Sequence, residues 1–143
     1  MPYRLLSYTS DLGIEVWAMS LAELFEESAR SVFSEMVNDL NSVEPRVTKE
    51  IEIEGNGVPA DTLKDWLAEL IYITDTEGLV FSEFKVRLEA TEAGLQRLTG
   101  VARGEKISAK RHVLKRAIKS ATYHNLSLKE EPWGWVATFI LDI

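Results

Sequence analysis

The sequence predicts an α+β fold in which two helices pack on a mainly antiparallel β-sheet. Two stretches, 20–36 and 60–73, repeat apolar residues at helical spacing. Shorter segments before, between and after them are rich in strand-forming residues, and the clearest alternate between apolar and charged residues. The order strand, strand, helix, strand, helix and then mostly strands predicts that both helices cover one face of the sheet. With 143 residues, the chain is expected to form one domain over 1–143.

The two helices have recognisable starts. Ser20 and Glu23 have the spacing of a capping box, in which the serine caps the helix and the glutamate reaches back. The second helix is expected from about Ala60 to Ile73, directly after Pro59. The apolar stripes consist of Leu21, Leu24, Phe25, Val32, Phe33 and Met36 in the first helix, and Leu63, Trp66, Leu67, Leu70 and Ile71 in the second. Each stripe requires a partner surface, which the strands supply.

The strands are placed by alternation and by turn residues. Alternation is clearest over 83–89 and is repeated over 51–54. The remaining strands are expected at 3–9 and 14–18, joined by a turn over 10–13, at 95–101 after a break at 92–94, and at 135–143. We predict that the basic segment, residues 106–119, is a loop followed by a short helical turn.

The charge distribution limits the kinds of molecule that the protein is expected to bind. The chain carries a net charge of −7, although the basic segment alone contains six Lys and Arg residues and no acid. An acidic body repels phosphate backbones, so autonomous nucleic-acid binding is disfavoured and a basic protein partner or a metal is favoured. No apolar run approaches the roughly 20 residues that a membrane helix needs. No signal peptide begins the chain, which predicts a cytoplasmic protein without membrane contact.

Motifs for nucleophilic catalysis or for phosphate-binding loops are absent from the sequence. With no cysteine and only two histidines, a closed zinc site is disfavoured, and oxygen ligands for calcium, magnesium or manganese remain. His112 lies among cations in the sequence, which predicts an exposed, neutral side chain. Of the four tryptophans, Trp133 follows a proline in a predicted turn and is expected at the surface, where aromatic residues serve interfaces.

Three acidic positions stand out as candidate cation ligands. Asp11 lies in the predicted turn between the first strands, and Asp75 and Glu77 follow the second predicted helix. Asp142 precedes Ile143, whose terminal carboxylate would complete a pair of oxygen ligands for a hard cation. Each position also has a plain structural interpretation: a bond within its own turn, the end of a helix, or a frayed tail.

Five blocks of the sequence, in order, resemble the archease family. They are Thr9 to Ile14, Leu67 to Val80, Gly104-Glu105, Ile118 to His124, and Gly134-Trp135 with the ending Leu141-Asp142-Ile143. Together they span essentially the whole chain. The opening departs from the family pattern, because Tyr8 stands where the family has histidine and Ser10 where it has alanine.

The resemblance implies a function that composition does not reveal. Archeases are partners of the RtcB-type ligase that seals broken tRNA halves, and they promote its guanylylation and its multiple turnover. The family is also associated with a bound divalent ion. Carried over to this sequence, the metal ligands would be Asp11, Asp142 and Ile143, and Lys119 would contact a phosphate or the partner. The protein would not be an enzyme, and it would reach tRNA only through the ligase.

Two other hypotheses assign the protein to different classes of function. A general interaction or chaperone-like module predicts an exposed apolar patch around Trp133. A stand-alone metal-dependent hydrolase requires a cleft with several inward carboxylates and a perturbed acid or base. The lack of a nucleophile or histidine cluster counts against the hydrolase.

Overall fold

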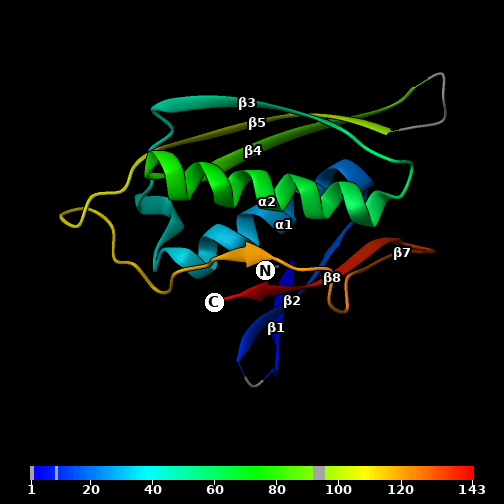
Figure 1. The fold of residues 1–143 in the computed structure, drawn as a ribbon, viewed down its shortest axis with the longest axis horizontal. Coiled ribbons are helices and arrows are strands. Elements are labelled where there is room, and N and C mark those ends of the chain that lie inside the picture. The colour runs from blue at the N-terminus through cyan, green and yellow to red at the C-terminus, as the bar shows by residue number, and fades with distance from the viewer. Residues whose placement is uncertain (1, 9, 92–95) are drawn as a thin grey trace.

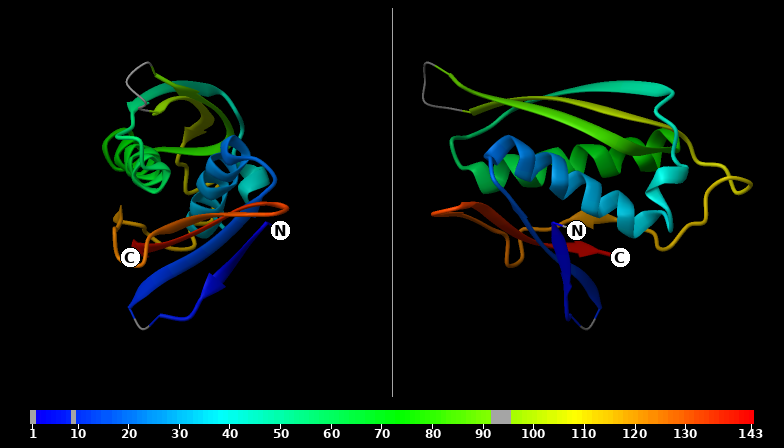
Figure 2. Two further views of the ribbon diagram at one scale, coloured as in Figure 1. Left: turned by 90° about the vertical axis from the view of Figure 1, so that its right-hand side faces the viewer. Right: turned by 180° about the vertical axis from the view of Figure 1, so that it is seen from behind.

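A computed structural model describes residues 2–8, 10–91 and 96–143, and its elements form three layers (Figures 1 and 2). Two helices, α1 (Leu21–Met36) and α2 (Pro59–Glu77), lie between a five-stranded and a three-stranded sheet, and each helix contacts both. The prediction of two helices with antiparallel strands is confirmed. The strands form two sheets rather than the one expected, so the helices are covered on both sides.

The five-stranded sheet contains both ends of the chain. Its strands are β1 (Tyr3–Leu6), β2 (Asp11–Ala18), β8 (Gly134–Asp142), β6 (Ser120–Ala121) and β7 (Ser127–Glu131). The order is β1-β2-β8-β6, with β7 also paired to β8, and every pairing is antiparallel. Strand β8 is therefore internal to this sheet. Strand β7, which sequence reasoning missed, has few apolar residues and pairs with β8 along its whole length.

The second sheet forms the opposite layer. Its strands are β3 (Val47–Glu54), β4 (Leu79–Ala90) and β5 (Gln96–Lys106). Strand β5 is central, pairs antiparallel with both neighbours, and has a register irregularity against β4 between Phe81 and Glu83. These strands are longer than the alternating segments from which they were predicted. The predicted break at 92–94 lies outside the described residues.

Helix α1 begins as its capping signal predicts. The backbone N–H of Glu23 donates to the hydroxyl of Ser20 at 3.2 Å, which satisfies one otherwise free N–H of the first turn. Leu24, Phe25 and Phe33 of its apolar stripe are fully buried. The spacing in the sequence therefore identified the face that packs into the core.

Helix α2 is longer than predicted. Its start after Val58 at Pro59 agrees with the sequence, but it continues four residues beyond Ile73 and ends at Gly78, where φ is 67°. Thr74 and Thr76 donate their hydroxyls to the carbonyls of Leu70 and Tyr72, so the polar C-terminal turn is compatible with helix. Glycine adopts the left-handed conformation without steric cost, which explains the stop.

The core is continuous through the three layers. Phe33 of α1 packs against Phe81 and Phe84 of β4, with ring centroids 5.6 Å apart in each pair. Trp66 of α2 lies edge-on to Phe84 and donates its indole N–H to the carbonyl of Phe25 at 3.0 Å. Satisfying that N–H lets the largest side chain of the core be completely buried.

The basic segment begins with a single turn, in which the N–H groups of Arg111 and His112 donate to the carbonyl of Ser108, and then crosses the end of α1. The predicted order, a loop followed by a helical turn, is therefore reversed. Leu114 forms a bridge with Val37, and the backbone N–H groups of Asn38 and Lys115 donate to Val113 and Met36 at 2.7 Å each. These bonds join the segment to the C-terminus of α1 as an extended chain. In the part of the chain that the structure describes, no helix is long and apolar enough to cross a membrane.

Candidate functional site

Asp11 and Asp142 stand directly opposite each other in the pairing of β2 with β8. Asp11 was expected in a turn but is the first residue of β2, because the pairing with the end of β8 extends the strand to it. Directly paired residues in an antiparallel sheet project from the same face, with Cβ atoms roughly 4.5–5.5 Å apart. We call these two half-buried residues the carboxylate pair.

The surroundings of the carboxylate pair favour a cation. Two like charges directly opposite each other destabilise a sheet unless a positive charge compensates them. Among the described residues, no hydrogen bond or ion pair reaches either carboxylate, and no group of three His, Cys, Asp or Glu side chains has a metal-binding arrangement. The pair is thus a set of two hard oxygen ligands, which fits calcium, magnesium or manganese and requires further ligands to complete a coordination shell.

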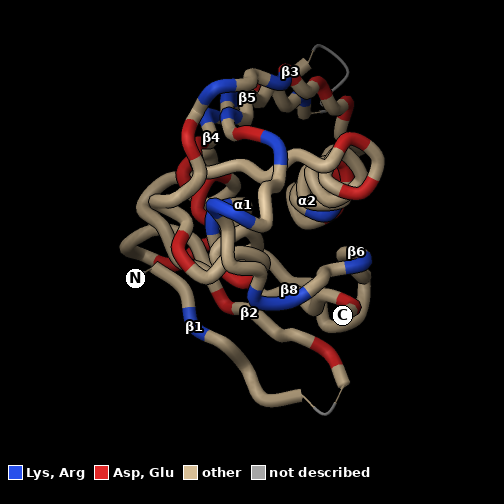
Figure 3. Tube along the Cα trace, turned by 90° about the vertical axis from the view of Figure 1, so that its left-hand side faces the viewer, with Lys and Arg blue, Asp and Glu red and all other residues tan. Residues whose placement is uncertain are grey.

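The other residues predicted for this site lie next to the pair. The backbone N–H of Lys119 donates to the carbonyl of Asp142 at 2.8 Å, and Ser120 pairs with Asp142 in the sheet. Ile143 follows Asp142 and is partly exposed. Figure 3 shows the C-terminus beside β6, which begins one residue after Lys119. Four predicted site residues from three segments of the sequence therefore meet at one end of the five-stranded sheet.

Asp75 and Glu77 do not join this site. They lie in the last turn of α2 rather than after the helix, and both are exposed. Glu77 forms an ion pair with Lys49 of β3 at 2.6 Å, which links the helix end to the three-stranded sheet. The structural interpretation of these residues, as a helix end, agrees with the contacts.

A buried cluster at the end of β5 was not predicted. Glu105 is 7% exposed and accepts the backbone N–H of Glu44, one nitrogen of Arg111, and Nε2 of His112 at 3.2 Å. Burial raises the pKa of Glu105, but the hydrogen bonds from Glu44, His112 and Arg111 outweigh it and lower the pKa below 4.5. Glu105 is therefore ionised and anchors the start of the basic segment.

His112 is buried in this cluster, with 3% of its surface exposed, so the expectation of an exposed histidine was wrong. Its Nδ1 accepts the backbone N–H of Ser108 at 2.9 Å. A nitrogen that accepts carries no proton, so the neutral ring has its proton on Nε2 and donates it to Glu105. Of the neighbouring cations in the sequence, Arg111 lies in the same cluster and binds the other carboxylate oxygen of Glu105.

A second buried carboxylate holds the other end of the basic segment. Glu35 of α1 accepts the hydroxyl of Tyr3 at 3.0 Å and lies 3.4 Å from nitrogens of Lys115 and Arg116. Burial, followed by the hydrogen bond to Glu35, raises the pKa of Tyr3 to about 12. Three of the six cations of the basic segment are thus engaged within the protein. Of the other three, Lys119 lies next to the carboxylate pair.

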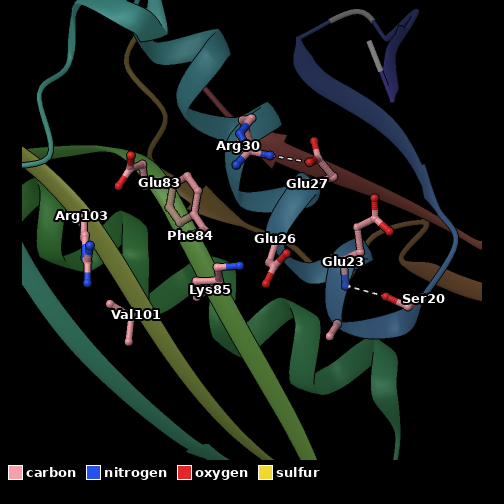
Figure 4. Close-up of a pocket in the computed structure, with 11 residues that line it drawn as sticks. Ser20, Glu23, Glu26, Glu27, Arg30, Glu83, Phe84, Lys85, Val101 and Arg103 are labelled. Atoms are coloured by element: carbon pink, nitrogen blue, oxygen red, sulfur yellow. Dashed lines mark hydrogen bonds and ion pairs between the residues drawn. The ribbon is translucent and has the colours of Figure 1, made fainter.

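A groove of about 750 Å³ lies elsewhere, between α1 and the three-stranded sheet (Figure 4). Charged residues of both signs line it, and Figure 4 shows Arg30 paired with Glu27 along α1. Glu26 accepts the backbone N–H of Val86 at 2.8 Å on the edge of β4. Glu26 thus joins α1 to the sheet and Glu27 pairs within α1, whereas the predicted ligands meet at the carboxylate pair, to which we assign the candidate site.

Comparisons with known proteins agree on one family. The model of the Archease protein family matches residues 3–143. The sequence is 36% identical to the protein archease of Methanopyrus kandleri over 143 residues, with all of both chains covered. It is 39% identical to that of Pyrococcus abyssi over 137 residues, which cover 95% of this chain and 94% of the relative.

Solved structures give the same result. The solution structure of Methanobacterium thermoautotrophicum protein 1598 superposes with a TM-score of 0.88 at 32% identity and covers 99% of each chain. The crystal structure of an archease from Thermotoga maritima, described as a possible chaperone, has a TM-score of 0.60 at 19% identity. It covers 96% of this chain and 94% of its own, and at that identity it supports the fold alone.

Proposed function

Because this chain belongs to the archease family, we propose that it activates an RtcB-type RNA ligase and is not itself an enzyme. The ligase seals RNA ends in tRNA splicing and RNA repair, and the activator promotes its guanylylation so that each ligase molecule turns over repeatedly. The observation that carries the proposal is the register of β2 and β8, which places Asp11 opposite Asp142. This pair would supply two carboxylates as oxygen ligands from a rigid sheet.

We propose that the carboxylate pair holds a divalent cation, either calcium, magnesium or manganese. Asp11 and Asp142 would be its side-chain ligands, and the terminal carboxylate of Ile143 would be a third in a chain that ends there. When bound, such a cation offsets negative charge on the triphosphate oxygens involved in guanylyl transfer. Lys119, exposed beside Asp142, would contact a phosphate or the ligase.

The chain's own residues would then position charge for another protein's active site. Two strands fix the separation of Asp11 and Asp142, and the bond from Lys119 to Asp142 keeps the lysine at the same end of the sheet. The internal ion pairs of the basic segment and the net charge of −7 disfavour independent RNA binding. We therefore infer that tRNA is reached only through the ligase.

The test is the number of ligations per molecule of the cognate ligase, measured on broken tRNA halves with GTP and a divalent metal. Catalytic amounts of this protein should raise that number well above one. Asp11→Asn and Asp142→Asn should abolish the increase, because each removes a charged ligand while it keeps the shape of the side chain.

Glu15→Gln is the matched control for these variants. Glu15 lies on the same strand and face as Asp11, but it pairs with Arg4 at 2.8 Å. This variant should stimulate the ligase as the original protein does. If Asp11→Asn and Asp142→Asn also stimulate fully, cation delivery is wrong, and if no protein raises turnover of an active ligase, the activator function is wrong.

A second candidate function is a general interaction or chaperone-like module. Trp133 is 53% exposed and Met19 is 80% exposed, and the backbone of Gly134 approaches that of Ala18 and Met19. An apolar surface of this kind fits an unfolded client. It predicts that the protein suppresses aggregation of unrelated clients and that Trp133→Ala weakens this effect without changing ligase turnover.

A further inference from the structure

The outer face of the five-stranded sheet points away from both helices and carries the carboxylate pair. Along β2, Leu12 and Ile14 face the core, so the alternation of a strand directs Asp11 and Gly13 outward. Gly13 pairs with Ile140 of β8. Ile140 is only 1% exposed although it lies outside the main core cluster, so something covers this part of the outer face.

Tyr8 lies over Gly13, the residue that pairs with Ile140. Its ring occupies the space above Gly13, because a Cβ built on Gly13 would be 2.4 Å from Cε2 of Tyr8 and 2.5 Å from Cδ2. Any residue other than glycine would displace the ring. The hydroxyl of Tyr8 accepts a 3.4 Å hydrogen bond from Nδ2 of Asn125, which lies in the turn after β6 and has a φ of 53°.

The contact ties a projecting part of the molecule to the sheet. The hairpin of β1 and β2 extends beyond the other strands, as Figures 1 and 2 show. Tyr8 lies in the connection between these strands, and its ring and hydroxyl together reach from β2 to the far side of β8. Gly13 is two residues from Asp11 on the same face, a separation of roughly 7 Å along a strand.

We propose that Tyr8 is a positioning residue that forms one wall of the cation site at Asp11 and Asp142. The inference rests on the proposed cation site. The ring holds the start of β2 against the sheet and excludes water from one side of the carboxylates, which strengthens their attraction for a cation. Because Gly13 has no side chain, one edge of the ring approaches the strand two residues from Asp11, on the same face.

The experiment measures cation affinity and stability separately. Tb³⁺, a luminescent substitute for calcium, is titrated into the purified protein and displaced with Ca²⁺, and thermal unfolding is followed in EDTA. Tyr8→Ala should weaken binding roughly tenfold, as the loss of residues that support ligands does. Tyr8→Phe should bind as the original protein does, because the ring is kept.

Two further variants distinguish an effect of the Tyr8 ring on cation affinity from a general loss of stability. Gly13→Ala keeps every charged group but pushes the ring away, so it should weaken binding as Tyr8→Ala does. Tyr123→Ala is the control: Tyr123 is also exposed, but it packs against Lys64 of α2, 4.5 Å from the ring centre. It should not change the affinity.

The outcomes distinguish this inference from the proposed site. If Tyr8→Ala binds as tightly as the original protein while Asp11→Asn does not bind, the site stands and the role of Tyr8 is overturned. If Tyr8→Phe and Tyr8→Ala lose cation affinity equally, the proposed role of the ring is also wrong, because Tyr8→Phe keeps the ring. If the original protein does not bind either cation, the site and the role of Tyr8 both fail.

Discussion

Glu105 accepts a hydrogen bond from Nε2 of His112 while Nδ1 of the same ring accepts the N–H of Ser108, so both nitrogens of a buried histidine have partners. The arrangement specifies a neutral ring with its proton on Nε2. It also makes a buried carboxylate the anchor of the basic segment, because Arg111 binds the same carboxylate.

Replacing this anchor should change the acid stability of the protein. The pKa of Glu105 is lower in the folded state than its ordinary value of 4.5, so its stabilising contribution is present above pH 4.5 and is lost as the pH falls through the folded pKa. Glu105→Gln should reduce the free energy of unfolding by about 2 kcal/mol at pH 7. Denaturant titrations between pH 7 and 3 should show that the free energy of unfolding falls less for the variant than for the original protein. If it falls equally in both proteins, the lowered pKa of Glu105 is contradicted.

Tyr3 should produce a pH dependence at the alkaline end. Its pKa is raised to about 12 in the folded state from an ordinary value of 10.0, so its contribution is full below pH 10 and is lost as the pH rises through 12. Tyr3→Phe should flatten the decrease in unfolding free energy over this range. The measurement is the difference between the two proteins, which removes the contribution of other groups. Tyr72→Phe, at an exposed tyrosine, is the control and should leave the decrease unchanged.

The carboxylate pair should destabilise the protein when no cation is present. Asp11→Asn removes the repulsion from Asp142 and should increase the free energy of unfolding in EDTA by about 0.5 kcal/mol. Saturating Ca²⁺ should reverse the ranking, because binding to the folded state stabilises only the original protein. Thermal unfolding of both proteins is measured in EDTA and in saturating Ca²⁺. If Asp11→Asn is the more stable protein in both buffers, the cation site is falsified.

Two glycines should respond differently to the same substitution. A Cβ on Gly104 would be 1.8 Å from the carbonyl oxygen of Val80 and 2.7 Å from Cα of Phe81, so the backbones of β5 and β4 would have to separate. Gly104→Ala should destabilise the fold by about 3 kcal/mol or more. Gly78→Ala meets no atom within 4 Å and should cost only about 1 kcal/mol, for its left-handed φ. Equal unfolding midpoints for the two variants would contradict the close approach.

Local patterns predicted the helices because the determinants of a helix are close in sequence. The spacing of Leu24, Phe25 and Phe33 and the cap at Ser20 were sufficient for α1. The end of α2 was misplaced because its last turn is polar and is stabilised by Thr74 and Thr76, which a search for apolar residues overlooks.

Non-local contacts explain what the sequence did not reveal. Asp11 looks like a turn residue until β8 pairs with it. His112 looks exposed because nothing in the sequence shows that the segment folds back, so that the ring meets Glu105 at the end of β5. The residues alone marked Asp11, Asp142 and Ile143 as candidate ligands on the same footing as Asp75 and Glu77. The resemblance selected the first three and added Lys119. The departure at Tyr8 was visible in the sequence, but its contact with Gly13 required the fold.

The internal position of β8 also determines when this protein can fold during its synthesis. A ribosome completes β2, α1, α2 and the whole three-stranded sheet before it makes β8, so the face of α2 that contacts β6 and β7 stays uncovered until that segment emerges. Newly made chains should therefore depend on protection from aggregation at this late stage. The carboxylate pair forms only when Asp142 joins Asp11, so the proposed cation binding would distinguish chains with β8 in place from chains that stop before it.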